Sequence, residues 1–355
     1  MIRSPKGILG RGLALFALGT LSALAAEKAK PAHEQFGFAQ AGRHVTVRYF
    51  VPPGATPQTT VVIVMHGVGR NGGDYLTDWM PYAKERGFLL IVPEFSKKKF
   101  PRDLSYNEGN TQDKDGRLLS REQWSFSAIE PIFDAVKART GNRAERYRLF
   151  GHSAGAQFVQ RFIYFVPAAR VERIVAANAG WYMLPDLSVA FPYGLKGTTV
   201  TEADLRHALT LPMTVLLGTA DTDLVLHSLR HTPEADAQGM YRLARGKYFH
   251  ARAVEAAQKL GLPLGWTLSF APDIAHADQD MAPFAVKLLF PIAPENAEAK
   301  KISQILRPEF AARRPRYAAF TAAGPRTMRD PLASLGSDRL IGKFPDNANP
   351  MDIAL

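Results

Sequence analysis

The pentapeptide GHSAG at 151–155 is the stretch of the sequence best suited to covalent chemistry. It follows an apolar run at 147–150 and leads into an apolar helical pattern at 154–165, which is the strand–turn–helix setting of a G-x-S-x-G turn. In such a turn the serine, here Ser153, projects outward from a strained backbone, and the outer glycines leave room for neighbouring chain. The helix behind it directs free N–H groups towards an oxyanion. The motif therefore predicts a serine that attacks carbonyl carbons.

Such a serine needs a base, and the base needs an acid that orients it. After a G-x-S-x-G turn the acid follows a later strand and the histidine comes near the end. The run 213–217 is followed by GTADTD, which makes Asp221 the predicted acid and leaves Asp223 as the alternative. His276 is the predicted base because it follows the late apolar run 266–270 through a short loop. The other downstream histidines lie near the acid's own loop or within a helical stretch: His227, His231 and His250.

Two backbone N–H groups are expected to bind the oxyanion. One belongs to Ala154, directly after the nucleophile, and the other to Val68, in the glycine-rich loop that follows the apolar run 61–65. His66, at the start of that loop, is expected to support it through hydrogen bonds rather than to carry protons. The loop lacks the Gly-Lys-Ser/Thr ending of a phosphate-binding loop, so a nucleotide site is not predicted.

The elements that must position these residues alternate between short apolar runs and helical patterns. The predicted strands are 43–51, 61–65, 88–92, 147–150, 174–177, 213–217 and 266–270. The predicted helices are 76–86, 127–138, 154–165, 232–260 and 277–289. This alternation predicts an α/β fold with a mostly parallel central sheet flanked by helices.

Two irregular stretches interrupt the alternation, at about 93–124 and 181–211. Both follow predicted strand ends, where α/β enzymes bind ligands, so they are expected to act as lid-like insertions. Trp181 and Tyr182 open the second stretch. They are candidates for a substrate-binding wall, although aromatic residues at this density also pack in cores.

No cofactor or metal is predicted. The chain contains no cysteine, which excludes disulfides, a thiol nucleophile and cysteine-ligated metals. The segment 111–122 matches several positions of a calcium-binding EF-hand loop, but the proline and glycine before it exclude the long entering helix. An Asp-Gly hairpin turn is predicted there instead.

The two ends of the chain differ from its middle. Residues 1–26 combine basic residues, a short apolar run and an Ala-Leu-Ala pattern, which predicts a signal peptide cleaved near Ala25 or Ala26 and an exported, periplasmic or secreted protein. A main domain would then span 27–292, and a basic, proline-containing extension 293–355. The formal net charge is +11. No nucleic-acid motif accompanies the basic extension, so nucleic-acid binding is not predicted, whereas peripheral contact with the cell envelope is an open alternative to a solvated tail.

Taken in order, the His-Gly loop, the GHSAG turn, the GTAD segment and the late His276 resemble the α/β-hydrolase superfamily over about residues 43–290. The segments HGVGRNGGDY, VPEFSKKKFP, GHSAGAQFVQRF and NAGWYMLPD are similar to exported polyhydroxybutyrate-depolymerase-like and feruloyl-esterase-like serine esterases. The resemblance implies that Ser153 attacks a carbonyl, that His276 moves the proton and that Asp221 orients His276. It also implies an acyl-enzyme intermediate.

The expected activity is therefore hydrolysis of a carboxylic ester, with a polyester or a hydroxycinnamate ester as candidate substrate. A serine peptidase on the same fold is the alternative within enzymes. A non-catalytic exported binding protein that kept the fold is the alternative from another class.

Overall fold

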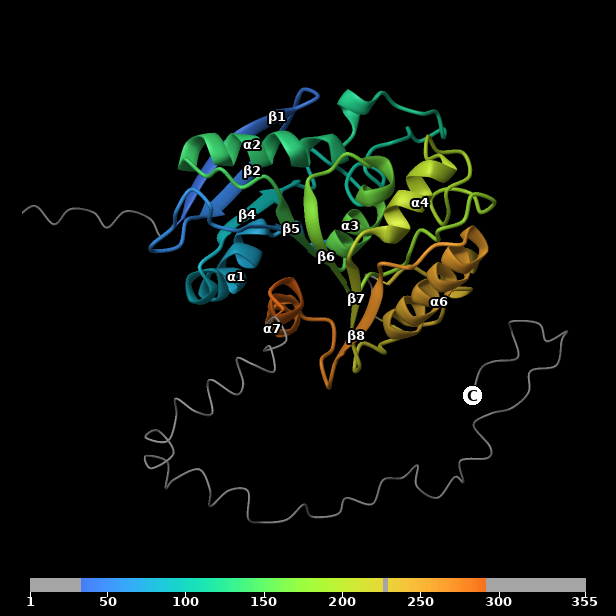
Figure 1. Ribbon diagram of the computed structural model, residues 1–355. Helices are drawn as coiled ribbons and strands as arrows, with labels where there is room; N and C mark the ends of the chain where they lie inside the picture. The colour runs from blue at the N-terminus through green and yellow to red at the C-terminus, as the bar shows by residue number, and fades with distance from the viewer. Residues whose placement is uncertain (1–32, 226–228, 292–355) are drawn as a thin grey trace, which may run out of the picture. The chain divides into compact units, whose positions relative to one another are not determined.

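The computed structural model describes residues 33–225 and 229–291, and the predicted signal peptide and basic extension lie outside this part of the chain. Its centre is an eight-stranded sheet with the order β1-β2-β4-β3-β5-β6-β7-β8 (Figure 1). The strands are β1 (Glu34–Gln40), β2 (Arg43–Phe50), β3 (Val61–Met65), β4 (Leu89–Glu94), β5 (Tyr147–His152), β6 (Val171–Ala177), β7 (Met213–Gly218) and β8 (Thr267–Ala271). The pairs from β4 to β8 are parallel, and β2 pairs antiparallel with β1 and β4. The predicted α/β fold is confirmed.

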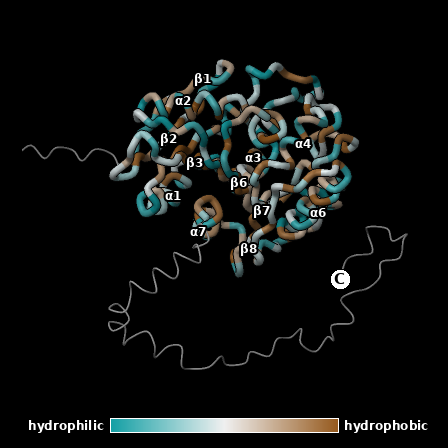
Figure 2. The backbone as a smooth tube through the Cα atoms, viewed as in Figure 1, coloured by the Kyte–Doolittle hydropathy of each residue, from teal (hydrophilic) through white to brown (hydrophobic). Residues whose placement is uncertain are grey.

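Helices cover both faces of the sheet and divide the core into two clusters (Figure 1). On one face lie α1 (Gly72–Arg86) and α7 (Asp278–Leu289), which bury Trp79 and Met281. On the other face lie α2 (Ile129–Thr140), α3 (Ala154–Phe165), α4 (Glu202–Thr210) and α6 (Arg242–Leu260). In Figure 2, α6 mixes hydrophilic with hydrophobic residues, as expected of a helix with one solvent-facing side.

β3 shows why the central strands of the sheet could be predicted from the sequence. All five of its residues are buried, and it lies between β4 and β5 in parallel register. A strand that is covered on both faces needs a continuous apolar run rather than an alternating one, which is what VVIVM supplies. The carboxyl ends of β3, β5, β7 and β8 therefore lead into the loops that carry the predicted site.

Three elements differ from the sequence prediction. β1 was not predicted, and it forms a hairpin with β2 through Ala41 and Gly42, both at positive φ. α4 lies inside the stretch 181–211, which was predicted to be an irregular insertion. The predicted helix 232–260 is two helices, α5 (Pro233–Asp236) and α6, because the chain turns at Gly239 with a φ of 133°.

Part of the stretch 93–124 packs onto the main core. Tyr106 and Trp124 are buried. The 3-10 turn η1 (Arg121–Gln123) lies at the end of the stretch, and a second one, η2 (Phe126–Ala128), leads into α2. Within it, Gln112 and Leu118 pair across a turn at Gly116, which has a φ of 79°. The predicted hairpin is therefore present where the EF-hand pattern was considered. Within residues 33–225 and 229–291 no helix is long and apolar enough to cross a membrane.

Candidate active site

Ser153 sits between the end of β5 and the start of α3, in a backbone conformation that serine rarely adopts. Its φ is 57° and its ψ is −115°. The residue is held there because its N–H donates to the carbonyl of Ala177 on β6 at 2.9 Å, while its own carbonyl accepts from Gln157 at 3.1 Å in the first turn of α3. The strain is therefore imposed by the strand on one side and the helix on the other.

The two glycines of the motif are required by close backbone contacts. A Cβ at Gly151 would lie 2.2 Å from the carbonyl oxygen of Gly155, and a Cβ at Gly155 would lie 2.0 Å from the carbonyl oxygen of Met65 on β3. Neither clash can be relieved by moving a side chain, because the obstructing atoms belong to the main chain. The glycines thus let α3 start directly against the sheet, with Ser153 at its N-terminus.

The structure brings together the three residues predicted to act as nucleophile, base and acid. The hydroxyl oxygen of Ser153 lies 2.9 Å from His276 Nε2, and His276 Nδ1 lies 2.8 Å from Asp221 Oδ2. These residues come from the ends of β5, β7 and β8. In this arrangement Nδ1–H donates to the carboxylate, which leaves Nε2 free to accept the serine proton.

Asp221 rather than Asp223 contacts the imidazole. Asp221 is 2% exposed and its second oxygen lies 3.5 Å from the guanidinium of Arg242, the first residue of α6. Burial lowers the pKa of Arg242, and the neighbouring Asp221 opposes that shift. Asp223 is exposed and accepts a hydrogen bond from the backbone of Val225 at 2.9 Å, the turn role that aspartate commonly has.

Both predicted oxyanion donors border the nucleophile. Val68 lines the same pocket as Ser153, and a Cβ on the preceding Gly67 would lie 3.6 Å from the Cβ of Ser153. Ala154 is the first residue of α3, so its N–H has no acceptor within that helix. The two N–H groups are thus carried by backbone segments on either side of the serine.

His66 lies beneath the glycine-rich loop. Its Nδ1 is 3.0 Å from the carbonyl of Gly67, and its Nε2 accepts from the N–H of Phe95 at 3.0 Å. The side chain is fully buried, and burial lowers its pKa to about 3. His66 is therefore a neutral imidazole that joins the loop after β3 to the segment after β4.

Two residues in the site were not recognised in the sequence, Tyr75 on α1 and His152 of the motif itself. The hydroxyl of Tyr75 lies 2.9 Å from His152 Nδ1, and the His152 ring packs against that of His276 with centroids 4.7 Å apart. Burial is the main reason that the pKa of His152 lies well below its ordinary value, and the neighbouring His276 and Arg242 lower it further. The position of His152 within the motif does not predict these contacts, because they depend on where α1 and the loop after β8 place Tyr75 and His276.

None of the other described histidines lines the pocket that contains Ser153. His231 lies between Asp236 and the carbonyl of Leu224, at 2.8 and 3.0 Å. His250 lies within α6, where burial lowers its pKa. His227 is outside the described residues.

Trp181 and Tyr182 are interior side chains, and neither lines the pocket that contains Ser153. Trp181 lies between two guanidinium groups, those of Arg161 and Arg230, each 4.2 Å from the ring centroid. Tyr182 stacks on Phe249 of α6 with centroids 4.4 Å apart. Of the two roles considered from the sequence, packing is the one that the structure displays.

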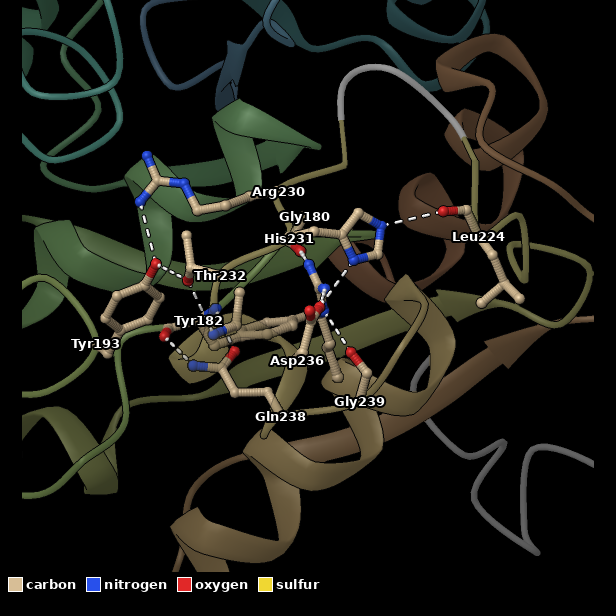
Figure 3. A network of polar contacts seen from close by, with 12 residues as sticks. Gly180, Tyr182, Tyr193, Leu224, Arg230, His231, Thr232, Asp236, Gln238 and Gly239 are labelled. Carbon is tan, nitrogen blue, oxygen red and sulfur yellow. Dashed lines mark hydrogen bonds and ion pairs between the residues drawn. The ribbon is translucent and has the colours of Figure 1, made fainter. Parts of the chain in front are cut away.

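The residues around α5 and the start of α6 are hydrogen-bonded to the segment that follows β6 (Figure 3). The side chain of Gln238 bonds both backbone groups of Tyr182 at 2.8 Å, and the hydroxyls of Tyr193 and Thr232 lie 2.7 Å apart. Arg245 donates to the carbonyl of Gly180 at 2.6 Å. These contacts join Thr232, Gln238 and α6 to the segment after β6.

An open pocket of about 570 Å³ borders Ser153 and His276, and we call it the α1–α7 pocket. Its lining comes from the loop after β3, the first half of α1, the turn at Ser153 and the start of α7. The residues are Gly67, Val68, Gly69, Asn71, Asp74, Tyr75, Thr77, Asp78, His152, Ser153, His276, Asp278 and Gln279. The pocket gives a substrate access to the hydroxyl of Ser153.

Comparison with known proteins identifies the family to which this chain belongs. No family model matches the chain, and no curated protein matches it. Among solved structures, poly(aspartic acid) hydrolase-1 from Sphingomonas sp. KT-1 is 46% identical over 74% of this chain and 99% of that one, with a TM-score of 0.72. The poly(3-hydroxybutyrate) depolymerase LpqC from Bordetella parapertussis is 34% identical over 76% and 93%, with a TM-score of 0.70. The chain therefore belongs to the α/β-hydrolase superfamily, among hydrolases of the esterase and depolymerase type.

Proposed function

We propose that this chain is a serine hydrolase that cleaves carboxylic esters through an acyl-enzyme intermediate. Ser153 is the nucleophile, His276 the base and Asp221 the acid that orients His276. The observation that carries the proposal is the pair of contacts through His276, 2.9 Å to the serine hydroxyl and 2.8 Å to the carboxylate. Nucleophilic catalysis by serine requires a base within this reach, itself held by a third group.

The chemistry follows from those contacts. Nε2 of His276 takes the proton of the Ser153 hydroxyl as the oxygen attacks the ester carbonyl, and the N–H groups of Val68 and Ala154 bind the resulting oxyanion. The imidazolium, stabilised by Asp221, then protonates the leaving alcohol and the acyl-enzyme forms. A water molecule gives its proton to Nε2 and attacks the acyl carbon, after which the acid product leaves and Ser153 regains its proton.

A second substrate class is favoured by a specific observation. The protein that is 46% identical to this chain is named as a hydrolase of poly(aspartic acid), and the one that is 34% identical as a depolymerase of poly(3-hydroxybutyrate). The same sequence of steps cleaves an amide, with an amine as the leaving group. We therefore include an aspartate polymer beside polyesters and hydroxycinnamate esters as a candidate substrate.

A fluorophosphonate probe tests the nucleophile directly. We expect the chain to be labelled, Ser153→Ala to lose labelling, and Ser188→Ala to keep it, because Ser188 is an exposed serine that bonds only to Asp186. Ester hydrolysis by Ser153→Ala should fall by at least about 10³-fold. Absence of labelling, beside a labelled control esterase, would favour the non-catalytic alternative. Labelling that persists in Ser153→Ala would mean that another residue is the nucleophile.

A substrate panel then separates the classes. It comprises p-nitrophenyl esters of increasing acyl length, methyl ferulate, poly(3-hydroxybutyrate) film, poly(aspartic acid) and peptide anilides. Hydrolysis of esters with little turnover of anilides supports an esterase. The reverse preference would support the peptidase alternative, and preferential cleavage of poly(aspartic acid) would assign the chain to amide polymers.

We also propose that the protein is exported and loses its first residues near Ala25 or Ala26. This rests on the sequence pattern of residues 1–26, which lie outside the described structure. Cell fractionation with N-terminal sequencing tests it, since an intracellular protein that begins at Met1 would contradict it. Contact of the basic extension with the cell envelope stays a prediction from the sequence.

A further inference from the structure

The α1–α7 pocket carries an excess of carboxyl groups next to the nucleophile. Asp74 and Asp78 lie one turn apart on α1, and Asp278 is the first residue of α7. All three line the pocket, and none of the side chains that line it is a lysine or an arginine. Like charges one helical turn apart oppose each other, so this arrangement does not stabilise α1 by itself.

The carboxyl of Asp278 has no hydrogen-bond partner in the described part of the chain. The residue is 9% exposed, and neither of its oxygens forms a hydrogen bond there. The indole of Trp79 lies close enough to lower the pKa of Asp278, yet its N–H also lacks an acceptor in hydrogen-bond geometry. Burial and the charge of Asp78 outweigh that contact and raise the pKa of Asp278 well above its ordinary value.

Its place at the start of α7 does not account for this burial. An aspartate in the first helical turn is stabilised by the helix dipole, but Asp280 supplies the same charge while remaining exposed. Asp278 also makes no capping hydrogen bond, and residue 277 at the N-cap is an alanine. A buried carboxyl whose only neighbouring donor is a poorly aligned indole N–H is costly in a folded protein, so such a group at a pocket wall indicates a partner that arrives from outside.

We infer that the α1–α7 pocket is a subsite for a primary ammonium or guanidinium group of the substrate, held by Asp278 with Asp78 and Asp74 at the pocket's outer part. Such a group supplies both the positive charge and the N–H donors that Asp278 lacks. No group of three or more carboxylates or histidines in residues 33–225 and 229–291 is arranged to hold a metal ion, so an organic cation is the better match.

The subsite deepens the proposed function and rests on it, because the cation is taken to be part of the cleaved substrate. It favours esters or amides that carry an amine or a guanidine near the scissile bond. An aspartate polymer would enter this pocket with its terminal ammonium rather than with its side-chain carboxylates, which the three acids would repel.

Binding is tested first in Ser153→Ala, so that the result does not depend on catalysis. Calorimetric titration with n-pentylammonium and with 1-pentanol compares a cation with its neutral counterpart. We expect the cation to bind at least about tenfold more tightly, and this preference to disappear when Asp278→Asn is added. Asp280→Asn is the matched control, since it removes a carboxylate from the same helical turn without touching the pocket, and it should leave the preference intact.

Kinetics in the otherwise unaltered chain give the second readout. The matched pairs are p-nitrophenyl 6-aminohexanoate against p-nitrophenyl heptanoate on the acyl side, and 5-aminopentyl acetate against hexyl acetate on the alcohol side. Asp278→Asn should lower kcat/KM for the cationic member of at least one pair by about tenfold more than it lowers kcat/KM for the neutral member. Asp78→Asn, at a partly exposed position, should act in the same direction and provides a test if Asp278→Asn does not fold.

The outcomes separate the two proposals. Equal binding of the cation and the alcohol, or a preference that survives both substitutions, would overturn the subsite even if esters are hydrolysed. A cation preference that depends on Asp278, in a chain that cleaves no substrate and takes no fluorophosphonate, would support the subsite and contradict the proposed hydrolase.

Discussion

Asp221 and Asp223 are two positions apart in the sequence, but their surroundings have little in common. Asp221 is buried between His276 and Arg242, whereas Asp223 is exposed and bonds to the backbone of Val225. A buried carboxylate that faces an imidazole can fix the ring's orientation and stabilise its protonated form, which an exposed turn residue cannot do.

The pair gives a matched test of the acid. Asp221→Asn should reduce kcat for ester hydrolysis by about 10⁴-fold, because the amide cannot stabilise the imidazolium and can select the wrong tautomer. Asp223→Asn should change kcat by no more than about twofold, as expected of an exposed side chain. Steady-state kinetics on a p-nitrophenyl ester measure both. If the larger loss followed Asp223→Asn, the assignment of the acid would have to be exchanged.

Individual site residues were predictable where a local pattern surrounds them. Ser153 is marked by its flanking glycines, and His276 by its place after a late strand. No local sequence pattern identifies Arg242 or Tyr75 as a site residue, because Arg242 reaches the site from α6 and Tyr75 reaches it from α1. Trp181 was ambiguous for a related reason, since the sequence cannot tell an aromatic wall from an aromatic core before the packing is known.

The turn between β5 and α3 depends on contacts between main chains. A Cβ on Gly155 would lie 2.0 Å from the carbonyl oxygen of Met65, so the helix would have to move away from β3. Since Ser153 is attached to the first turn of that helix, any such movement would also alter its distance to His276.

Gly155→Ala is therefore expected to lower the free energy of unfolding by at least about 3 kcal/mol, the upper end for overpacked cores. Gly54→Ala is the control, because its φ is 74° but nothing lies within 4 Å of the added carbon. It should cost about 1 kcal/mol, from backbone strain alone. Urea unfolding monitored by circular dichroism measures both, and equal losses would show that the close approach of α3 to β3 does not matter.

Strands and helices of the central layer were predictable because burial on both faces leaves a continuous apolar run, as in β3. The edge strand β1 could not be predicted in this way, because most of its residues are exposed or half-buried. α4 was not predicted, because its short amphipathic pattern follows an irregular, aromatic-containing run within the stretch 181–211. The break at Gly239 lies inside a long helical pattern, and that pattern does not predict the φ of 133° that the glycine adopts.

Acid should destabilise the folded chain through its buried histidines. Burial holds the pKa of His66 at about 3, against about 6.5 in an unfolded chain, and lowers that of His152 as well. As the pH falls below about 6.5, the unfolded chain takes up a proton that folded His66 does not, so the free energy of unfolding decreases until the pH approaches the folded pKa. Asp278, whose pKa is raised, acts in the opposite direction.

The contribution of His66 is isolated by comparing the chain with His66→Asn in urea at pH 7.5 and 5.5. Between these values the loss of stability should be smaller in the variant, by up to about 1.4 kcal/mol for each pH unit below 6.5. Identical pH dependence in the two proteins would show that His66 is not neutral when buried. Imidazole NMR provides an independent readout, because the ring should keep its proton on Nδ1 throughout this range.

The backbone of Ser153, at a φ of 57° and a ψ of −115°, sets the proposed reaction of this residue against the stability of the fold. A glycine would adopt this conformation without strain, whereas serine costs on the order of 1–3 kcal/mol, so a serine here is expected only where the proposed reaction requires its hydroxyl. In descendants of this chain that no longer require the proposed activity, we expect glycine to replace serine at this turn early in their divergence. Such proteins would have a higher melting temperature than their ancestor and would lack the proposed hydrolase activity.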